Sequence, residues 1–171
     1  MIYDAIMRIL TNFTDSNTSL LPSSLKQVLC YHEAIIFLWK FFEFNTSAIP
    51  TILHKSTISS AVGPILFTLN ESIGETTNFA MANVCTFMLL KLSHEREFGI
   101  GLNKTNKASE YLGIIKGSLA DLLLQVYTRA MRYGTQLEFL WPYFLITLSN
   151  VSPFIRGINL GTAAELMKLM G

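Results

Sequence analysis

Residues 92–104 read Leu92-Ser93-His94-Glu95-Arg96-Glu97-Phe98-Gly99-Ile100-Gly101-Leu102-Asn103-Lys104, and this stretch separates two helical halves of the chain. Before it, apolar residues recur at helical spacing over residues 79–92. Three consecutive charges at residues 95–97 then interrupt the pattern, which predicts that the helix ends at the surface. Gly99 and Gly101 alternate with apolar residues, and we expect them to allow a sharp turn through positive φ. The stretch therefore predicts a helix end followed by an ordered loop over about residues 98–117.

Outward from this stretch, apolar residues also recur at helical spacing in both halves of the chain. The predicted helices cover residues 2–10, with a loop over the polar run 12–19, then 22–42, a short piece at 49–55, and 58–69, 76–94, 118–133, 137–148 and 162–170. About eight helices and no alternating strand pattern predict an all-α domain. Pairing of these helices at intervals of roughly 40 residues favours stacked helical hairpins, as in a HEAT- or armadillo-like α-solenoid.

Several residue types mark the expected helix boundaries. The predicted boundary residues are Ser23 or Ser24 as the cap of the second helix, Gly63-Pro64 as a kink or break, Thr76 or Thr77 as a cap, Ser118 with Asp121 as a capping box, Gly134 as a stop, Pro142 in a first turn, and Thr162-x-x-Glu165 as the last helix start. The last helix runs to the final residues with no stop signal, so we expect residues 1–171 to be one all-helical segment of a longer solenoid. Whether Met1 is the native start stays open.

The composition limits the classes of function. Half of the 171 residues are apolar and only 15% are charged, with a mean hydropathy of +0.38, so much of the surface is expected to be covered or to meet lipid. The net charge of +1 does not indicate the strongly basic surface that is typical of nucleic-acid-binding proteins. Cys30 and Cys85 lie within apolar helical patterns, which predicts buried thiols in a reducing compartment. No apolar window reaches the roughly 18–20 residues that a membrane span needs.

Targeting signals are mostly absent from the first residues. Residues 1–10 have neither a basic region nor an apolar core with a cleavage site, so they do not predict a signal peptide. Six glycosylation sequons occur, at Asn12, Asn17, Asn45, Asn70, Asn103 and Asn150. Asn, Ser and Thr are frequent in these loops, so the sequon pattern occurs easily by chance, and we expect these sites to remain unmodified.

Candidate chemistry is sparse. Cys30 and His32 lie two positions apart on one helix and point to different faces, and no metal-ligand spacing accompanies them, so we expect no metal site and no cofactor. His32 is expected in the core and His94 at a helix C-terminus. Glu95 and Glu97 resemble an acid/base pair only in composition, because they project to opposite sides of a helix or strand. We therefore expect no enzyme.

Charged and aromatic residues have structural interpretations too. Arg96 is expected to pair with a neighbouring carboxylate and hold the loop in place. A more specific hypothesis places basic residues along an anionic lipid surface; the residues concerned are Lys91, Arg96, Lys104, Lys107 and Lys116. Trp39 and Trp141 lie at the centres of apolar stripes and are expected in the core.

Six short motifs, in order and at suitable spacing, resemble the family of high-temperature-induced dauer-formation proteins, which are relatives of dymeclin. The motifs are Leu21-Pro22-Ser23-Ser24, the helix with Cys30-Tyr31-His32-Glu33 and Phe37-Leu38-Trp39-Lys40, Phe44-Asn45 with Val62-Gly63-Pro64-Ile65-Leu66, residues 92–104, Ala120-Asp121-Leu122-Leu123, and Ser149-Asn150-Val151-Ser152-Pro153-Phe154. The resemblance covers nearly the whole chain. Members are several times longer, so the chain resembles one internal segment.

The resemblance implies a non-enzymatic peripheral scaffold or adaptor on the cytosolic face of the Golgi, acting in protein sorting and secretory vesicle traffic. Its implied partners are other secretory-pathway proteins, the Golgi membrane and the remainder of its own longer chain. The expected family-motif surface comprises Glu95, Arg96, Glu97, Phe98, Gly99, Leu102, Asn103 and Lys104, with loop stabilisation and partner docking as its two interpretations. An integral membrane helical protein, or a helical hydrolase using Glu95 and Glu97, stays open as an alternative.

Overall fold

The computed structural model of the chain describes residues 2–18, 30–47, 49–50, 53, 58–73, 78–105, 117–133 and 135–170. These residues form α1 (Ile2–Thr18), α2 (Tyr31–Phe44), α4 (Ile58–Glu71), α5 (Phe79–Ser93), α6 (Arg96–Gly101), α8 (Leu119–Tyr133), the 3-10 helix η1 (Thr135–Leu140), α9 (Trp141–Val151), the 3-10 helix η2 (Ser152–Phe154) and α10 (Leu160–Met170). Within these ranges the only strand-like pairing is an isolated antiparallel bridge between Thr105 and Ser118. The predicted all-α class is confirmed.

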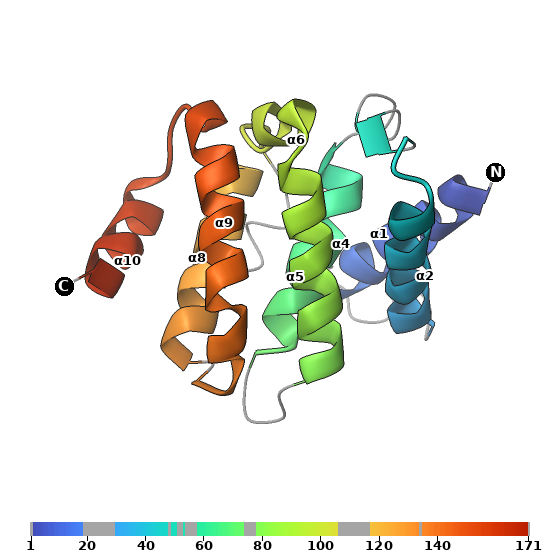
Figure 1. Cartoon of the computed structure of the whole chain (residues 1–171), viewed down its shortest axis with the longest axis horizontal. Coiled ribbons are helices and arrows are strands. Elements are labelled where there is room, and N and C mark those ends of the chain that lie inside the picture. The colour runs from blue at the N-terminus through green and yellow to red at the C-terminus, as the bar shows by residue number, and fades with distance from the viewer. Residues whose placement is uncertain are drawn as a thin grey trace.

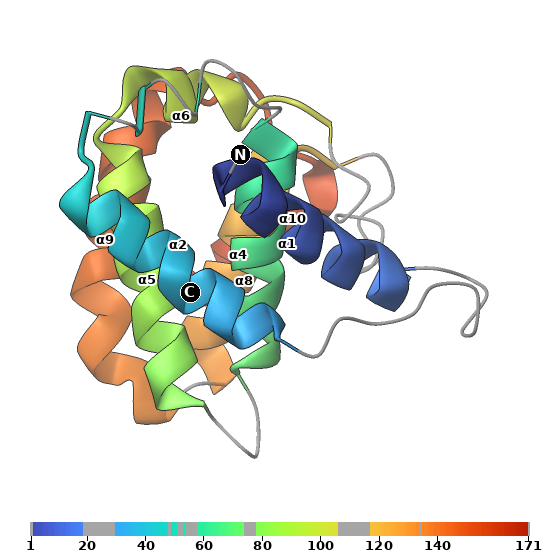
Figure 2. The ribbon, with the colours of Figure 1, turned by 90° about the vertical axis from the view of Figure 1, so that its right-hand side faces the viewer.

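The longer helices form two layers (Figure 1). One layer contains α2, α5 and α9 side by side, and the layer behind it contains α1, α4, α8 and α10. Figure 2 shows the same two layers edge-on, with the N-terminal helix at the near end. Helices α1 and α2 pack on each other across the layers, as do α4 and α5, while η1 lies between α8 and α9. Two pairs of helices that follow each other among the described elements, α1 with α2 and α4 with α5, therefore pack across the two layers.

The hydrophobic core fills the space between the layers, with α4 at its centre. Every residue of α4 from Ala61 to Asn70 is buried. Helix α4 runs without interruption through Pro64, so the predicted division at Gly63-Pro64 is wrong, while the alternative of a kink stays a prediction. The Thr68 hydroxyl donates a hydrogen bond of 2.9 Å to the Pro64 carbonyl, and this helix is enclosed on both sides by α1 and α8. Tertiary packing thus outweighs the preference of proline for helix ends.

Two predicted helix boundaries agree with the structure. The Ser118 hydroxyl accepts from the Asp121 N–H at 3.1 Å, and the Asp121 carboxylate accepts from the Ser118 N–H at 2.8 Å, which is the expected capping box. Pro142 lies in the first turn of α9, as expected, where its missing N–H leaves no hydrogen bond unmade.

Other boundaries differ from the prediction. Helix α1 continues to Thr18 instead of ending near Leu10. Asn78 caps α5 by accepting from the Met81 N–H at 3.1 Å. Helix α10 begins at Leu160, two residues before Thr162, because Asn159 accepts from the Gly161 N–H at 2.9 Å and acts as the cap. The proposed caps Ser23, Ser24, Thr76 and Thr77, and the proposed stop Gly134, lie outside the described residues.

The two cysteines have opposite environments. Cys85 is fully buried, as predicted, and its burial raises the pKa of its thiol. Cys30 is exposed at the N-cap position of α2, so its predicted burial is wrong. His32 is half-buried with its ring against Tyr31, and therefore lies at the edge of the core. Trp39 and Trp141 are partly buried and pack against the core.

Candidate functional site

Residues 92–105, which divide the sequence into two helical halves, form a corner after the C-terminal end of α5. We call this segment the 92–105 corner. It begins at the C-terminus of α5, where His94 is exposed and its Nδ1 lies 2.9 Å from the Leu90 carbonyl oxygen. The position of His94 at the helix end is as predicted. Beneath it, buried Ser93 accepts a hydrogen bond of 2.9 Å from the Asn150 amide of α9. This bond ties the ends of α5 and α9 together.

A short helix occupies the place where a loop was expected. Helix α6 begins directly after Glu95 and buries Phe98, Gly99 and Gly101, while Arg96, Glu97 and Ile100 are exposed. Neither glycine adopts a positive φ, so the predicted reason for their presence is wrong. A Cβ on Gly99 would overlap the ring of Phe154, with Cγ only 2.9 Å away, and a Cβ on Gly101 would overlap the side chain of Ile58. The glycines are needed for close approach.

Asn103 joins the corner to the segment that follows α9. Its amide donates to the Phe154 carbonyl at 2.9 Å and to the Ile100 carbonyl at 3.0 Å. Its side-chain oxygen accepts from the Arg156 N–H at 2.8 Å. A single side chain therefore holds both sides of Ile155, at the start of the extended connection between η2 and α10. We call residues 155–159 the strap.

Asp121 holds the other end of the strap. The buried carboxylate accepts from the Asn159 N–H at 2.6 Å and from the Ser118 hydroxyl at 2.8 Å, besides the capping-box bond described above. Burial alone raises the pKa of Asp121, but the hydrogen bonds from Ser118 and Asn159 outweigh it and hold the pKa below its usual value of 3.8. The carboxylate is therefore fixed in its ionised form, with donors on two sides.

The corner and the first turn of α8 are also joined through the backbone. The Leu102 carbonyl accepts from the Ala120 N–H at 2.8 Å, and the Lys104 carbonyl accepts from the Leu119 N–H at 3.0 Å. Three of the sequence motifs, residues 92–104, 120–123 and 149–154, thus meet at one place in space. They are separated in the sequence but act as one structural unit.

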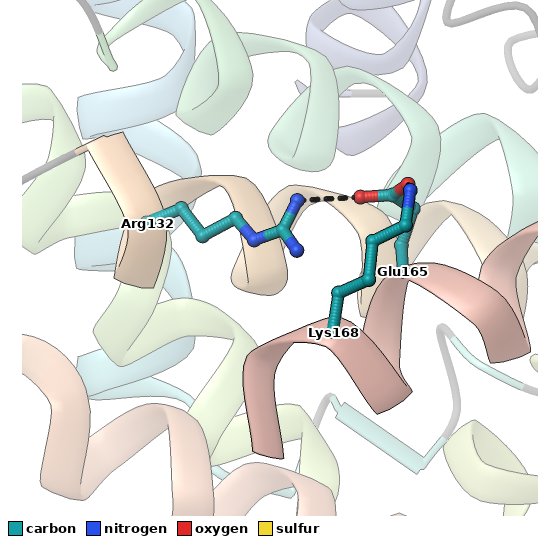
Figure 3. Close-up of polar contacts among 3 residues, drawn as sticks. All are labelled: Arg132, Glu165 and Lys168. Atoms are coloured by element: carbon teal, nitrogen blue, oxygen red, sulfur yellow. Dashed lines mark hydrogen bonds and ion pairs between the residues drawn. The ribbon is translucent and has the colours of Figure 1, made fainter. Parts of the chain in front are cut away.

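Polar contacts beyond the strap hold α10 against α8. Arg132 of α8 donates to Glu165 of α10 at 2.7 Å, and Lys168 contacts the other carboxylate oxygen at 2.7 Å (Figure 3). These contacts lower the pKa of Glu165, with the Lys168 hydrogen bond as the largest cause. Gln125 of α8 donates to the Thr162 hydroxyl at 3.3 Å.

The predicted surface residues divide into two groups. Phe98, Gly99, Leu102 and Asn103 face inward and build the corner, whereas Arg96, Glu97 and Lys104 are exposed and Glu95 is half-exposed. Within the described part of the chain Arg96 makes no ion pair, so the expected pairing with a carboxylate is wrong. Asn103 provides the stabilisation assigned to Arg96. Lys107 and Lys116 lie outside the described residues.

The sequence did not indicate every residue that holds the strap. Asn159 was missed, although asparagine directly before a helical run is a common cap signal. Arg156 takes part through its backbone N–H alone, so no side-chain pattern announces it. Asp121 was expected only as a cap, because its contact with Asn159 spans 38 positions.

Polar side chains in and around the corner make structural hydrogen bonds. Asn103 and Asp121 use their polar atoms to hold backbone groups, while Glu97 is exposed. Among the described residues, no group of three or more His, Cys, Asp or Glu side chains is placed to hold a metal ion. Across the same residues, no helix combines the length and the apolar character needed to cross a membrane.

Comparison with known proteins explains why these motifs occur together. The family model described as "Dymeclin: Dyggve-Melchior-Clausen syndrome protein" matches residues 1–171. The chain belongs to the dymeclin family. The resemblance seen in the sequence is thereby confirmed, and the 92–105 corner is part of a dymeclin-family segment.

Similar curated proteins are all called Protein HID1. The human and mouse proteins are each 31% identical over 153 residues, which is 88% of this chain and 19% of each relative. The Dictyostelium discoideum protein is 27% identical over 169 residues, which is 98% of this chain and 19% of the relative. The chain therefore spans about a fifth of the length of the curated relatives it matches. No solved structure is significantly similar to it.

Proposed function

We propose that the chain is a segment of a non-enzymatic scaffold or adaptor that associates peripherally with the cytosolic face of Golgi membranes and acts in protein sorting and secretory vesicle traffic. Membership of the dymeclin family is the observation that carries this proposal. The two layers of packed helices support the scaffold part, because a HEAT- or armadillo-like α-solenoid, which we propose the longer protein forms, offers long surfaces for other proteins. Its partners would be secretory-pathway proteins and the remainder of the longer chain.

The sequons support the cytosolic side. Asn70 is buried and accepts a hydrogen bond from Arg129, Asn103 holds the strap, and Asn150 donates to Ser93. A glycan is attached to the amide nitrogen, so it would disturb the hydrogen bonds that Asn103 and Asn150 donate, and it would find no room at buried Asn70. A chain with three such sites is suited to a compartment where they are not glycosylated.

The outward side of the 92–105 corner is the proposed docking surface. Arg96, Glu97, Ile100 and Lys104 are exposed on or next to α6, and Ile100 is 42% exposed. Asn103 and the two glycines hold the backbone beneath these residues in place. This surface would therefore lose little conformational entropy when it binds a partner. A mixed charged and apolar patch of this kind suits a protein partner.

The first test is to tag the longer family protein that contains this chain, image it with a Golgi marker and extract the membranes with alkaline carbonate. We expect Golgi overlap and release into the soluble fraction. Retention in the membrane pellet would favour the integral membrane alternative, and a diffuse cytosolic signal would contradict the Golgi assignment.

A matched pair of variants tests the docking surface. Arg96→Ala with Lys104→Ala should reduce Golgi overlap, whereas Lys40→Ala with Glu43→Ala removes an exposed ion pair on α2 and should leave it unchanged. Equal circular-dichroism spectra of the two purified chains would exclude misfolding as the cause. Unchanged Golgi overlap in both variants would remove the corner as the docking surface.

A further inference from the structure

The outward face of α10 carries an apolar stripe. Leu160, Ala164 and Met167 recur at helical spacing on the side opposite the buried Thr162. Leu160 is 85% exposed and Met167 is 65% exposed. We call these three residues the α10 stripe. Contiguous exposed apolar residues on an ordered helix mark a surface that another protein segment covers.

The opposite end of the same layer looks different. The outward face of α1 carries Asp4, Arg8 and Asp15, all exposed, at the same helical spacing. Exposed charged side chains of this kind suit contact with water. Within the layer that contains α1 and α10, the exposed apolar stripe therefore lies at the α10 end, while α2 of the other layer also exposes apolar side chains, among them Phe37 and Phe44.

The position of α10 in the layers shows what would fit there. Helices α1, α4, α8 and α10 follow one another in one layer, and the described part of the other layer stops at α9 (Figure 1). Tyr143 contacts Phe87 and Asn150 contacts Ser93, so these residues mark the side of α9 that faces α5. Leu145 lies on the other side of α9 and is 58% exposed. It adjoins the place where the next helix of that layer would lie.

We propose that the α10 stripe and Leu145 form the docking surface for a further helical hairpin of the longer family protein. One helix of the hairpin would lie beside α10 and the other beside α9, continuing both layers. The curated relatives are about five times the length that this chain covers, so they contain ample chain for such a hairpin. The stripe has no charge of its own, so its occupant is a helix with an apolar face. This inference rests on the packing of the helices and is independent of any role in trafficking.

The test compares the accessibility of one position in two proteins. Met167→Cys, in a Cys30→Ser background, provides an exposed thiol on the stripe, and Cys85 stays buried. Its maleimide labelling rate is measured in the 171-residue chain and in the longer protein that contains it. We expect labelling about tenfold slower or more in the longer protein, the factor that protection by about 1.4 kcal/mol produces. Arg8→Cys, on the charged face of α1, is the control and should react equally fast in both.

Two results would overturn the proposal. Equal labelling rates at position 167 in both proteins would show that the stripe remains open. Dimerisation of the 171-residue chain, detected by light scattering and abolished by Met167→Glu, would identify a second copy as the occupant instead. Met167 is exposed, so both substitutions at this position should preserve the fold, which matching melting temperatures would verify.

Discussion

The two ends of the layer formed by α1, α4, α8 and α10 are attached in opposite ways. Helix α1 buries Ile6, Met7 and Leu10 against its neighbours and presents charges outward. Helix α10 has no fully buried apolar side chain in the described residues, is held by polar contacts to α8 and by the strap, and presents apolar residues outward. One end is closed by hydrophobic packing, and the other is positioned by hydrogen bonds.

This difference gives the family motifs a physical role. Hydrogen bonds are directional and contribute modestly to stability, whereas apolar burial contributes more but fixes orientation less. Asn103 and Asp121 therefore set where α10 lies without committing much apolar surface to it. A helix held in this way keeps its apolar face available for another contact.

The largest expected effect separates the two ends directly. Leu10→Ala removes a fully buried side chain from the α1 end and should lower the free energy of unfolding by about 2–5 kcal/mol. Met167→Ala at the α10 end should change it by less than about 0.5 kcal/mol, because Met167 is exposed. Urea unfolding of the 171-residue chain measures both. Similar losses in the two variants would show that the ends are not attached differently.

The second prediction concerns the close contact that seats the strap. Gly99→Ala places a methyl group against the rigid ring of Phe154 and should lower the free energy of unfolding by about 1–3 kcal/mol. Gly157→Ala, within the strap itself, meets no atom within 4 Å and is the matched control. We expect the control to be neutral or slightly stabilising in the same urea experiment. A neutral Gly99→Ala would argue against close packing of α6 on η2.

The third prediction uses pH. The pKa of Asp121 is lower in the folded chain than its usual value of 3.8, so its contribution is complete above pH 3.8 and is lost as the pH falls through the folded pKa. Asp121→Asn should lower the free energy of unfolding by about 1–2 kcal/mol near neutral pH. The difference from wild type should shrink below pH 3.8, as measured by thermal unfolding across the acid range. A difference that stays constant with pH would show that the Asp121 charge is not involved.

The sequence predicted features that depend on local spacing. Helical periodicity identified the all-α class, and the Ser118–Asp121 capping box and Pro142 in a first turn were also correct. Local signals failed where distant contacts decide the outcome. Gly99 predicted a turn, but glycine is needed there because a Cβ would overlap the ring of Phe154, which lies 55 positions away in the sequence. The charge of Arg96 predicted that this residue holds the corner in place. The neutral amide of Asn103 does so instead, because it can both donate and accept hydrogen bonds.

The most direct test of this account is native-state hydrogen exchange on Asn103→Ala. The substitution removes the bonds to Phe154 and Arg156 and should cost about 1 kcal/mol. If the 92–105 corner holds α10 in place, the amide protons of α10 and of the strap will exchange faster in the variant. The amide protons of α4 and α5 will keep their protection from exchange. Equal loss of protection in α4, or unchanged exchange in α10, would contradict it.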